Sequence, residues 1–122
     1  MYQNMTNAYQ TYQQNQVNTA SPGKLLLMLY DGALKFLRLA MVALEEENFE
    51  KTNEYLKKTQ NIVHELMITL NFDVGDIAQN LYDLYDFMNH ELIQANIKKD
   101  MKKIKNVKKI LEDLRSAWVQ II

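Results

Sequence analysis

The 122-residue sequence contains no cysteine, only three glycines and one proline. Without cysteine there is no disulfide framework, no thiolate metal site and no cysteine nucleophile, and the composition fits a reducing compartment such as the cytosol. Glycine and proline together make up about 12% of an average chain, so few turns are expected here. The shortage predicts long helices joined by short connections.

Two further absences exclude classes of function. The 14 Lys and Arg residues against 15 Asp and Glu give a net charge of −1, without the basic excess typical of proteins that bind nucleic acid. No unbroken apolar run approaches the roughly 18 residues that cross a bilayer, and the N-terminus has neither the basic start nor the apolar stretch of a signal peptide. We therefore expect a single cytoplasmic domain with no nucleic-acid partner and no membrane insertion.

The motifs of catalysis and metal binding are also missing. Helical bundles that hold two irons use Glu-x-x-His pairs, but Asn61 and Phe87 stand three residues before the two histidines, His64 and His90. The sequence has no glycine-rich phosphate loop, no nucleophile elbow and no clustered general acid and base. We expect no enzymatic activity, no catalytic residue, no metal and no cofactor.

The N-terminal segment differs from the rest of the chain. Residues 1–23 contain no charged side chain and are rich in Asn and Gln, a composition that buries too little apolar surface to order itself alone. We expect residues 1–20 to form a flexible arm or lid ahead of a bundle at 21–122. The arm is either a frayed terminus or a docking segment, and in the second case the amphipathic or apolar residues Tyr9, Tyr12 and Val17 are its expected contacts.

After the arm, four amphipathic segments predict helices. Ser21 is a favourable N-cap and Pro22 a favourable first residue, so the first helix should begin at Pro22 and run to about Leu44. Further segments at about 49–70 and 77–98 repeat apolar residues at threes and fours, as does the stretch from 101 onward. Four helices of about 20 residues with short links predict an all-α, antiparallel four-helix bundle with a mobile N-terminal arm.

Aspartates mark the starts of the last two helices. Their side chains can accept hydrogen bonds from the free amides of a first helical turn. The expected caps are Asp73 or Asp76 for the third helix and Asp100 for the fourth.

The first helix carries more apolar surface than a bundle needs. Its charged residues, Lys24, Asp31, Lys35 and Arg38, share one narrow strip, whereas a bundle helix normally buries a single stripe. A smaller excess of apolar residues lies on the third helix. Adjacent apolar bands on two helices indicate a groove for a partner helix. The same bands could instead close a homodimer of the free protein. The expected partner contacts are Leu27, Met28, Leu34 and Met41 on the first helix and Ala78, Tyr82, Tyr85 and Ile93 on the third.

Charge is unevenly distributed along the chain. From Lys98 onward lie eight of the 14 basic residues and three of the 15 acidic ones. Such a run typically forms a solvated face that balances acidic neighbours. Contact with RNA or another anionic partner is the alternative, and it would weaken steeply with added salt.

Several short motifs resemble one known family in order and spacing. They are AY at 8–9, YQQNQV at 12–17, ASPGKL at 20–25, MLYDGA at 28–33, NLY at 80–82, LYDFM at 84–88, ANIKKD at 95–100 and the late Trp118. Together they resemble the flagellin-specific export chaperones of the FliS family over essentially the whole chain.

The resemblance implies a function that agrees with the apolar surplus. Members of this family are antiparallel four-helix bundles of the bacterial cytosol that bind the disordered C-terminal segment of flagellin. They prevent its premature polymerisation and aid its delivery to the flagellar type III export apparatus, so the cytosolic domain of the export gate is an expected second partner. The resemblance also implies that the N-terminal arm covers part of the empty client site. An adaptor for flagellar regulatory proteins is the alternative.

Overall fold

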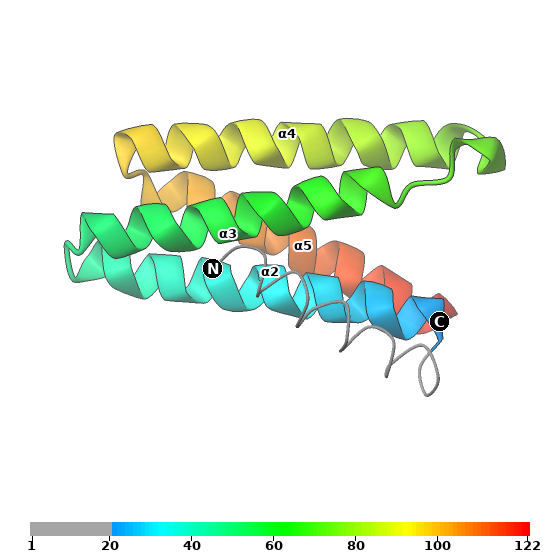
Figure 1. Ribbon diagram of the computed structural model, residues 1–122, viewed down its shortest axis with the longest axis horizontal. Helices are drawn as coiled ribbons and strands as arrows, with labels where there is room; N and C mark the ends of the chain where they lie inside the picture. The colour runs from blue at the N-terminus through cyan, green and yellow to red at the C-terminus, as the bar shows by residue number, and fades with distance from the viewer. Residues whose placement is uncertain (1–20) are drawn as a thin grey trace, which may run out of the picture.

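The computed structural model describes residues 21–122, which form an all-α, antiparallel four-helix bundle (Figure 1). The long helices are α2 (Pro22–Glu45), α3 (Phe49–Ile68), α4 (Asp76–Lys98) and α5 (Met101–Ile121), and a 3-10 turn, η1 (Phe72–Val74), precedes α4. Helix α2 packs against α3 and α5, and α4 packs against the same two helices. The predicted fold class is therefore confirmed.

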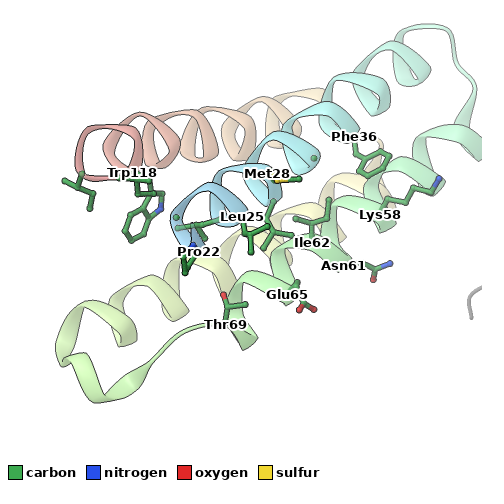
Figure 2. A pocket seen from close by; sticks show the side chains of 16 residues that line it. Pro22, Leu25, Met28, Phe36, Lys58, Asn61, Ile62, Glu65, Thr69 and Trp118 are labelled. Carbon is green, nitrogen blue, oxygen red and sulfur yellow. The ribbon is translucent and has the colours of Figure 1, made fainter. Parts of the chain in front are cut away.

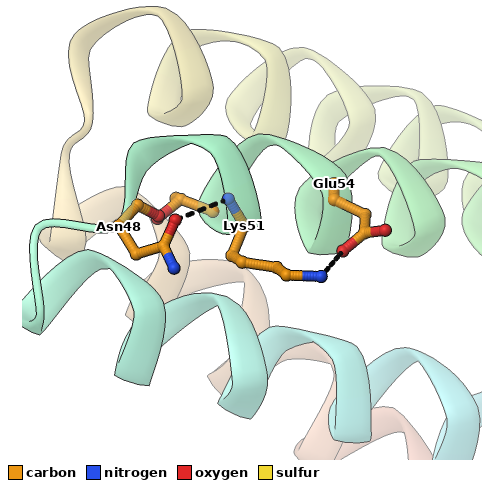
Figure 3. A network of polar contacts seen from close by, with 4 residues as sticks. Asn48, Lys51 and Glu54 are labelled. Carbon is orange, nitrogen blue, oxygen red and sulfur yellow. Dashed lines mark hydrogen bonds and ion pairs between the residues drawn. The ribbon is translucent and has the colours of Figure 1, made fainter.

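Local capping explains where most helices begin. The Ser21 side chain accepts a hydrogen bond from the Lys24 amide and Pro22 is the first residue of α2, as predicted. Asp100 caps α5 by accepting from the Lys102 amide, again as predicted. At the start of α3 the Asn48 side chain accepts from the amide of Lys51, whose ammonium pairs with Glu54 (Figure 3). Side-chain oxygens thus satisfy amide donors that the first turn leaves free.

The start of α4 differs from the prediction. Its N-cap is Gly75, which offers no side-chain acceptor, so the expectation that Asp73 or Asp76 caps this helix is wrong. Asp73 lies inside η1 and Asp76 is the first residue of α4. Gly75 has a φ of 99°, a backbone conformation that favours glycine because it has no Cβ, and the turn is built on that freedom rather than on a side-chain cap.

One apolar core fills the space between the helices. Its largest fully buried side chains include Tyr30 and Leu37 from α2, Leu56 from α3, Leu92 from α4 and Leu111 from α5. Burying side chains of this size contributes roughly 1.5–3 kcal/mol each relative to exposure. The core therefore holds the four helices in a fixed relation, which positions the cavities described next.

The predicted arm or lid, residues 1–20, lies outside the described residues, and so do its predicted contacts Tyr9, Tyr12 and Val17. The division of the chain into this arm and a bundle at 21–122 stays a prediction.

Candidate binding site: an apolar cavity beside α2

A cavity of about 950 Å³ lies between α2, α3 and the end of α5, and we call it the main cavity (Figure 2). Apolar side chains dominate its described lining. They are Leu25, Leu26, Met28, Leu29 and Phe36 from α2, Ile62 from α3, and Trp118 and Ile121 from α5, with Ile122 at the chain end. A cavity of this size and character suits an apolar ligand or the apolar face of a peptide helix.

Gly32 helps to create the hollow. A Cβ added there would lie 3.2 Å from Cδ1 of Ile62, so the absence of a side chain lets the two helices approach while Ile62 still lines the cavity. Glycine inside a helix costs about 1 kcal/mol relative to alanine. The close approach explains why the residue occurs in the middle of α2.

Polar groups border the cavity on the side of α3. Lys58, Asn61, Glu65 and Thr69 line it there, and Figure 2 shows them in a row along that helix. The Lys58 ammonium lies over two aromatic rings, 5.4 Å from the centroid of Phe36 and 5.9 Å from that of Tyr55. The two rings stack with centroids 6.3 Å apart. The site therefore combines an apolar floor with a charged and polar edge.

A second, smaller cavity of about 220 Å³ adjoins the first at the end of the bundle where α4 begins. Leu26, Thr69 and Trp118 line both cavities, and the smaller one also has Val74, Ile77 and Leu81 in its lining. The two hollows therefore share part of their walls.

A buried chain of polar contacts supports the shared wall. The indole Nε1–H of Trp118 donates to the hydroxyl of Tyr30 at 3.0 Å, and that hydroxyl lies 2.5 Å from the hydroxyl of Tyr85. These three side chains come from α5, α2 and α4. Burial raises the pKa of Tyr30 and of Tyr85 above the usual value near 10, because the apolar core disfavours the phenolate. Both phenols are therefore neutral over the physiological pH range.

Three of the predicted contact residues lie in the core. Leu34 is 3% exposed, and Ala78 and Tyr85 are each 1% exposed. Their expected place on a surplus surface is wrong, because α2 and α4 are rotated so that these positions face neighbouring helices. Ala78 and Tyr85 lie beneath the smaller cavity as part of its lining.

The other predicted contacts are divided among several surroundings. Met28 lines the main cavity, as expected of a partner contact. Met41 is partly buried against the core, and Leu27 is half-buried and belongs to the described lining of neither cavity. Tyr82 and Ile93 are exposed on α4, and the Tyr82 ring packs at a tilt against Phe72 with centroids 5.9 Å apart. The structure thus brings only Met28 to the main cavity.

Several cavity residues were missed by the sequence reasoning. Phe36, Ile62 and Trp118 are not among the predicted contact residues, although Trp118 belongs to the motifs that carry the family resemblance. The available signals were the apolar surplus around α2 and the glycine at position 32. Neither signal identifies the parts of α3 and α5 that complete the cavity.

Within residues 21–122, His, Asp and Glu side chains form no group of three that could hold a metal ion. Over that part of the chain, no helix has the length of apolar sequence that a bilayer crossing requires.

Comparison with known proteins gives a consistent assignment. The family model described as "Flagellar protein FliS" matches residues 5–122. The "Flagellar secretion chaperone FliS" of Bacillus subtilis (strain 168) is 48% identical over 116 residues, which cover 95% of this chain and 86% of the relative. The protein of the same description from Vibrio cholerae is 39% identical over 108 residues, covering 88% of this chain and 79% of that relative.

A solved structure agrees with these relatives. The "Crystal structure of flagellar chaperone from bacteria" superposes with a TM-score of 0.78 at 26% sequence identity, and the match covers 95% of each chain. The four-helix architecture, the length of the sequence matches and the family model lead to one conclusion: the chain belongs to the FliS family of flagellar secretion chaperones.

Proposed function

We propose that this protein is a cytoplasmic, non-enzymatic chaperone that binds the disordered C-terminal segment of flagellin. Binding keeps flagellin from polymerising prematurely, and the complex is delivered to the flagellar type III export apparatus through the cytosolic domain of the export gate. The observation that carries the proposal is the main cavity, an apolar hollow of about 950 Å³ in a chain of this family. Flagellin segments that pair in the filament as amphipathic helices present the apolar face that such a cavity accommodates.

The proposed client surface centres on the main cavity and its neighbour. Three of the predicted contacts remain in it because they line one of the two cavities: Met28 the main one, and Ala78 and Tyr85 the smaller one. Phe36, Ile62 and Trp118 are added because they line the main cavity. Tyr82 and Ile93 provide a separate exposed apolar area on α4, 38% and 41% exposed, for a client that continues around the bundle. An extended client of this kind bears a large ordering cost, which requires a long apolar track.

The N-terminal arm enters the same proposal as a competitor. We assign residues 1–20 the role of a lid over part of the empty site, with Tyr9, Tyr12 and Val17 as its contacts or as docking points for the export gate. A version lacking residues 1–17 should then bind the flagellin segment more tightly than the full chain. Equal binding by both forms would keep the chaperone role and reject the lid.

Calorimetric titration of the full chain with the C-terminal segment of the cognate flagellin tests the function. We expect binding with a clearly negative heat-capacity change, because apolar surface is buried. Absence of binding by both the full and the shortened chain, with helices intact by circular dichroism, would overturn the proposal.

A matched pair of substitutions on α3 tests the location of the site. Ile62→Gln places a polar amide in the main cavity, and an unpaired amide in an apolar contact costs roughly 1–3 kcal/mol, or about tenfold in affinity. Ile68→Gln makes the same change on the same helix at a side chain that is 63% exposed and belongs to neither cavity lining. Weakened binding by the first variant alone supports the assignment, and equal effects would place the client elsewhere.

A further inference from the structure

Trp118 lines both cavities. The position is unusual because the linings are mainly apolar and the indole carries a polar N–H group. Figure 2 shows it reaching from α5 toward the start of α2. An indole has one N–H donor and no acceptor. In an apolar binding track this donor must either find a partner or remain unpaired against the bound segment.

The partner lies in the core. The Trp118 N–H donates to the Tyr30 hydroxyl at 3.0 Å, and Tyr30 is completely buried. The indole therefore directs its polar edge inward and leaves its carbon surface for the cavities. The Tyr30 oxygen is itself held by the contact with the Tyr85 hydroxyl, whose side chain is 1% exposed.

We propose that Tyr30 is a positioning residue for client recognition, which acts by accepting the Trp118 N–H and so fixing the indole as an apolar wall common to both cavities. The inference rests on the proposed function, because it assigns a role in binding the flagellin segment. The fixed indole favours clients that present a continuous apolar face across the wall that the two cavities share. A client with a polar group at this point would find no exposed indole donor to pair with.

Tyr30→Phe removes the acceptor but keeps the ring and the packing. The freed N–H is then unpaired in the core, or the indole turns and brings the N–H to the cavity, and either state opposes an apolar client. We expect the dissociation constant for the flagellin segment to rise about fivefold or more. Thr59→Val is the matched control: it removes one buried hydroxyl, which donates to the Tyr55 carbonyl oxygen within α3, from a side chain that lines neither cavity. Its affinity should stay within about twofold of wild type.

Fluorescence separates positioning from stability. Trp118 is the only tryptophan in the chain, so the emission maximum and acrylamide quenching report on its surroundings alone. Both should change in free Tyr30→Phe and stay close to wild type in Thr59→Val, although each variant loses a buried hydroxyl and the urea midpoint of unfolding falls in both. Equal changes of affinity and emission in both variants would overturn the positioning role.

A double variant tests the pairing directly. With Trp118→Phe the donor is gone, so adding Tyr30→Phe should cause no further loss of affinity. Additive losses would contradict the proposal. If Tyr30→Phe alone fails to fold, recovery of folding and binding in the double variant supports the pairing, and failure of the double variant overturns it.

The same binding measurements distinguish failure of the proposed function from failure of the positioning role of Tyr30. If the wild-type protein does not bind the flagellin segment at all, the proposed function fails and the client role of Tyr30 fails with it. If wild type binds and Tyr30→Phe binds equally well, the chaperone function stands and the positioning role alone is rejected.

Discussion

The guanidinium of Arg115 faces the carboxylate of Asp31 in a two-point contact, with Nε 2.6 Å from Oδ1 and Nη2 3.5 Å from Oδ2. This pair joins α5 to α2 along the edge of the bundle. Both side chains keep substantial exposure, 37% and 56%, so solvent and salt screen the interaction.

Replacing Asp31 with Asn should therefore lower the free energy of unfolding by less than about 1 kcal/mol. Urea unfolding at low and at high salt measures the effect, and the difference from wild type should shrink as salt rises. Asp113→Asn is the control, because it breaks an ion pair with Lys109 inside α5 alone. A loss well above 1 kcal/mol at Asp31 that does not depend on salt would contradict this account.

Removing the cap of α3 should cost more than breaking that surface pair. Asn48→Ala deletes the acceptor of the Lys51 amide, which lies 3.2 Å from Oδ1. We expect the free energy of unfolding to fall by about 1 kcal/mol in urea titrations. Asn48→Asp keeps an acceptor at the same place and should retain most of the stability. If both variants lose the same amount, the cap is not the cause.

Substitution of Gly32 should separate stability from binding. Gly32→Ala removes the glycine penalty, and the new Cβ meets only the mobile end of Ile62, 3.2 Å away. We expect the free energy of unfolding to rise by up to about 1 kcal/mol. Calorimetry should show weaker binding of the flagellin segment, because the displaced Ile62 end narrows the main cavity. Unchanged affinity with a bulkier Gly32→Leu variant that stays folded would contradict the location of the site.

The buried phenols predict a loss of stability in alkaline solution. Burial raises the pKa of Tyr30 and Tyr85, whereas an unfolded tyrosine ionises near pH 10. The folded state therefore binds these protons more tightly, so their stabilising contribution is complete below about pH 10 and is lost as the pH rises beyond it. The urea midpoint of unfolding should show no effect of these two phenols below about pH 10, and it should decline as the pH rises above that value.

Absorbance of tyrosinate checks the same prediction. The chain has seven tyrosines. The tyrosinate absorbance of Tyr30 and Tyr85 should appear only when the protein unfolds. Tyr85→Phe should reduce the late part of the titration and flatten the alkaline decline in stability. Complete ionisation of all seven tyrosines near pH 10 with the helices intact would contradict the burial of these hydroxyls.

The sequence predicted the helices well because their signals are local. Ser21, Pro22 and Asp100 act within one helical turn, and the apolar repeats at threes and fours define each buried stripe. The cap of α4 was misassigned because Gly75 provides a backbone conformation and no acceptor, so the nearby aspartates were the stronger sequence signal.

The site was harder to predict because it depends on how each helix is rotated against its neighbours. Leu34 and Met28 are both predicted partner contacts on the first helix, and the spacing of about 100° per residue places them on opposite borders of its charged strip. Leu34 is buried in the core, whereas Met28 lines the main cavity. Residues such as Ile62 become part of the site only when three helices come together, and no periodicity within one helix contains that information.

The start of α2 fixes where the predicted arm joins the bundle. Pro22 and Gly23 line the main cavity, so residues 1–20 are tethered covalently at its border. A short flexible tether produces an effective local concentration of about millimolar. If the arm does cover the site, a weak contact would suffice to exclude stray apolar peptides, and only a client that gains contacts beyond the arm's reach would displace it.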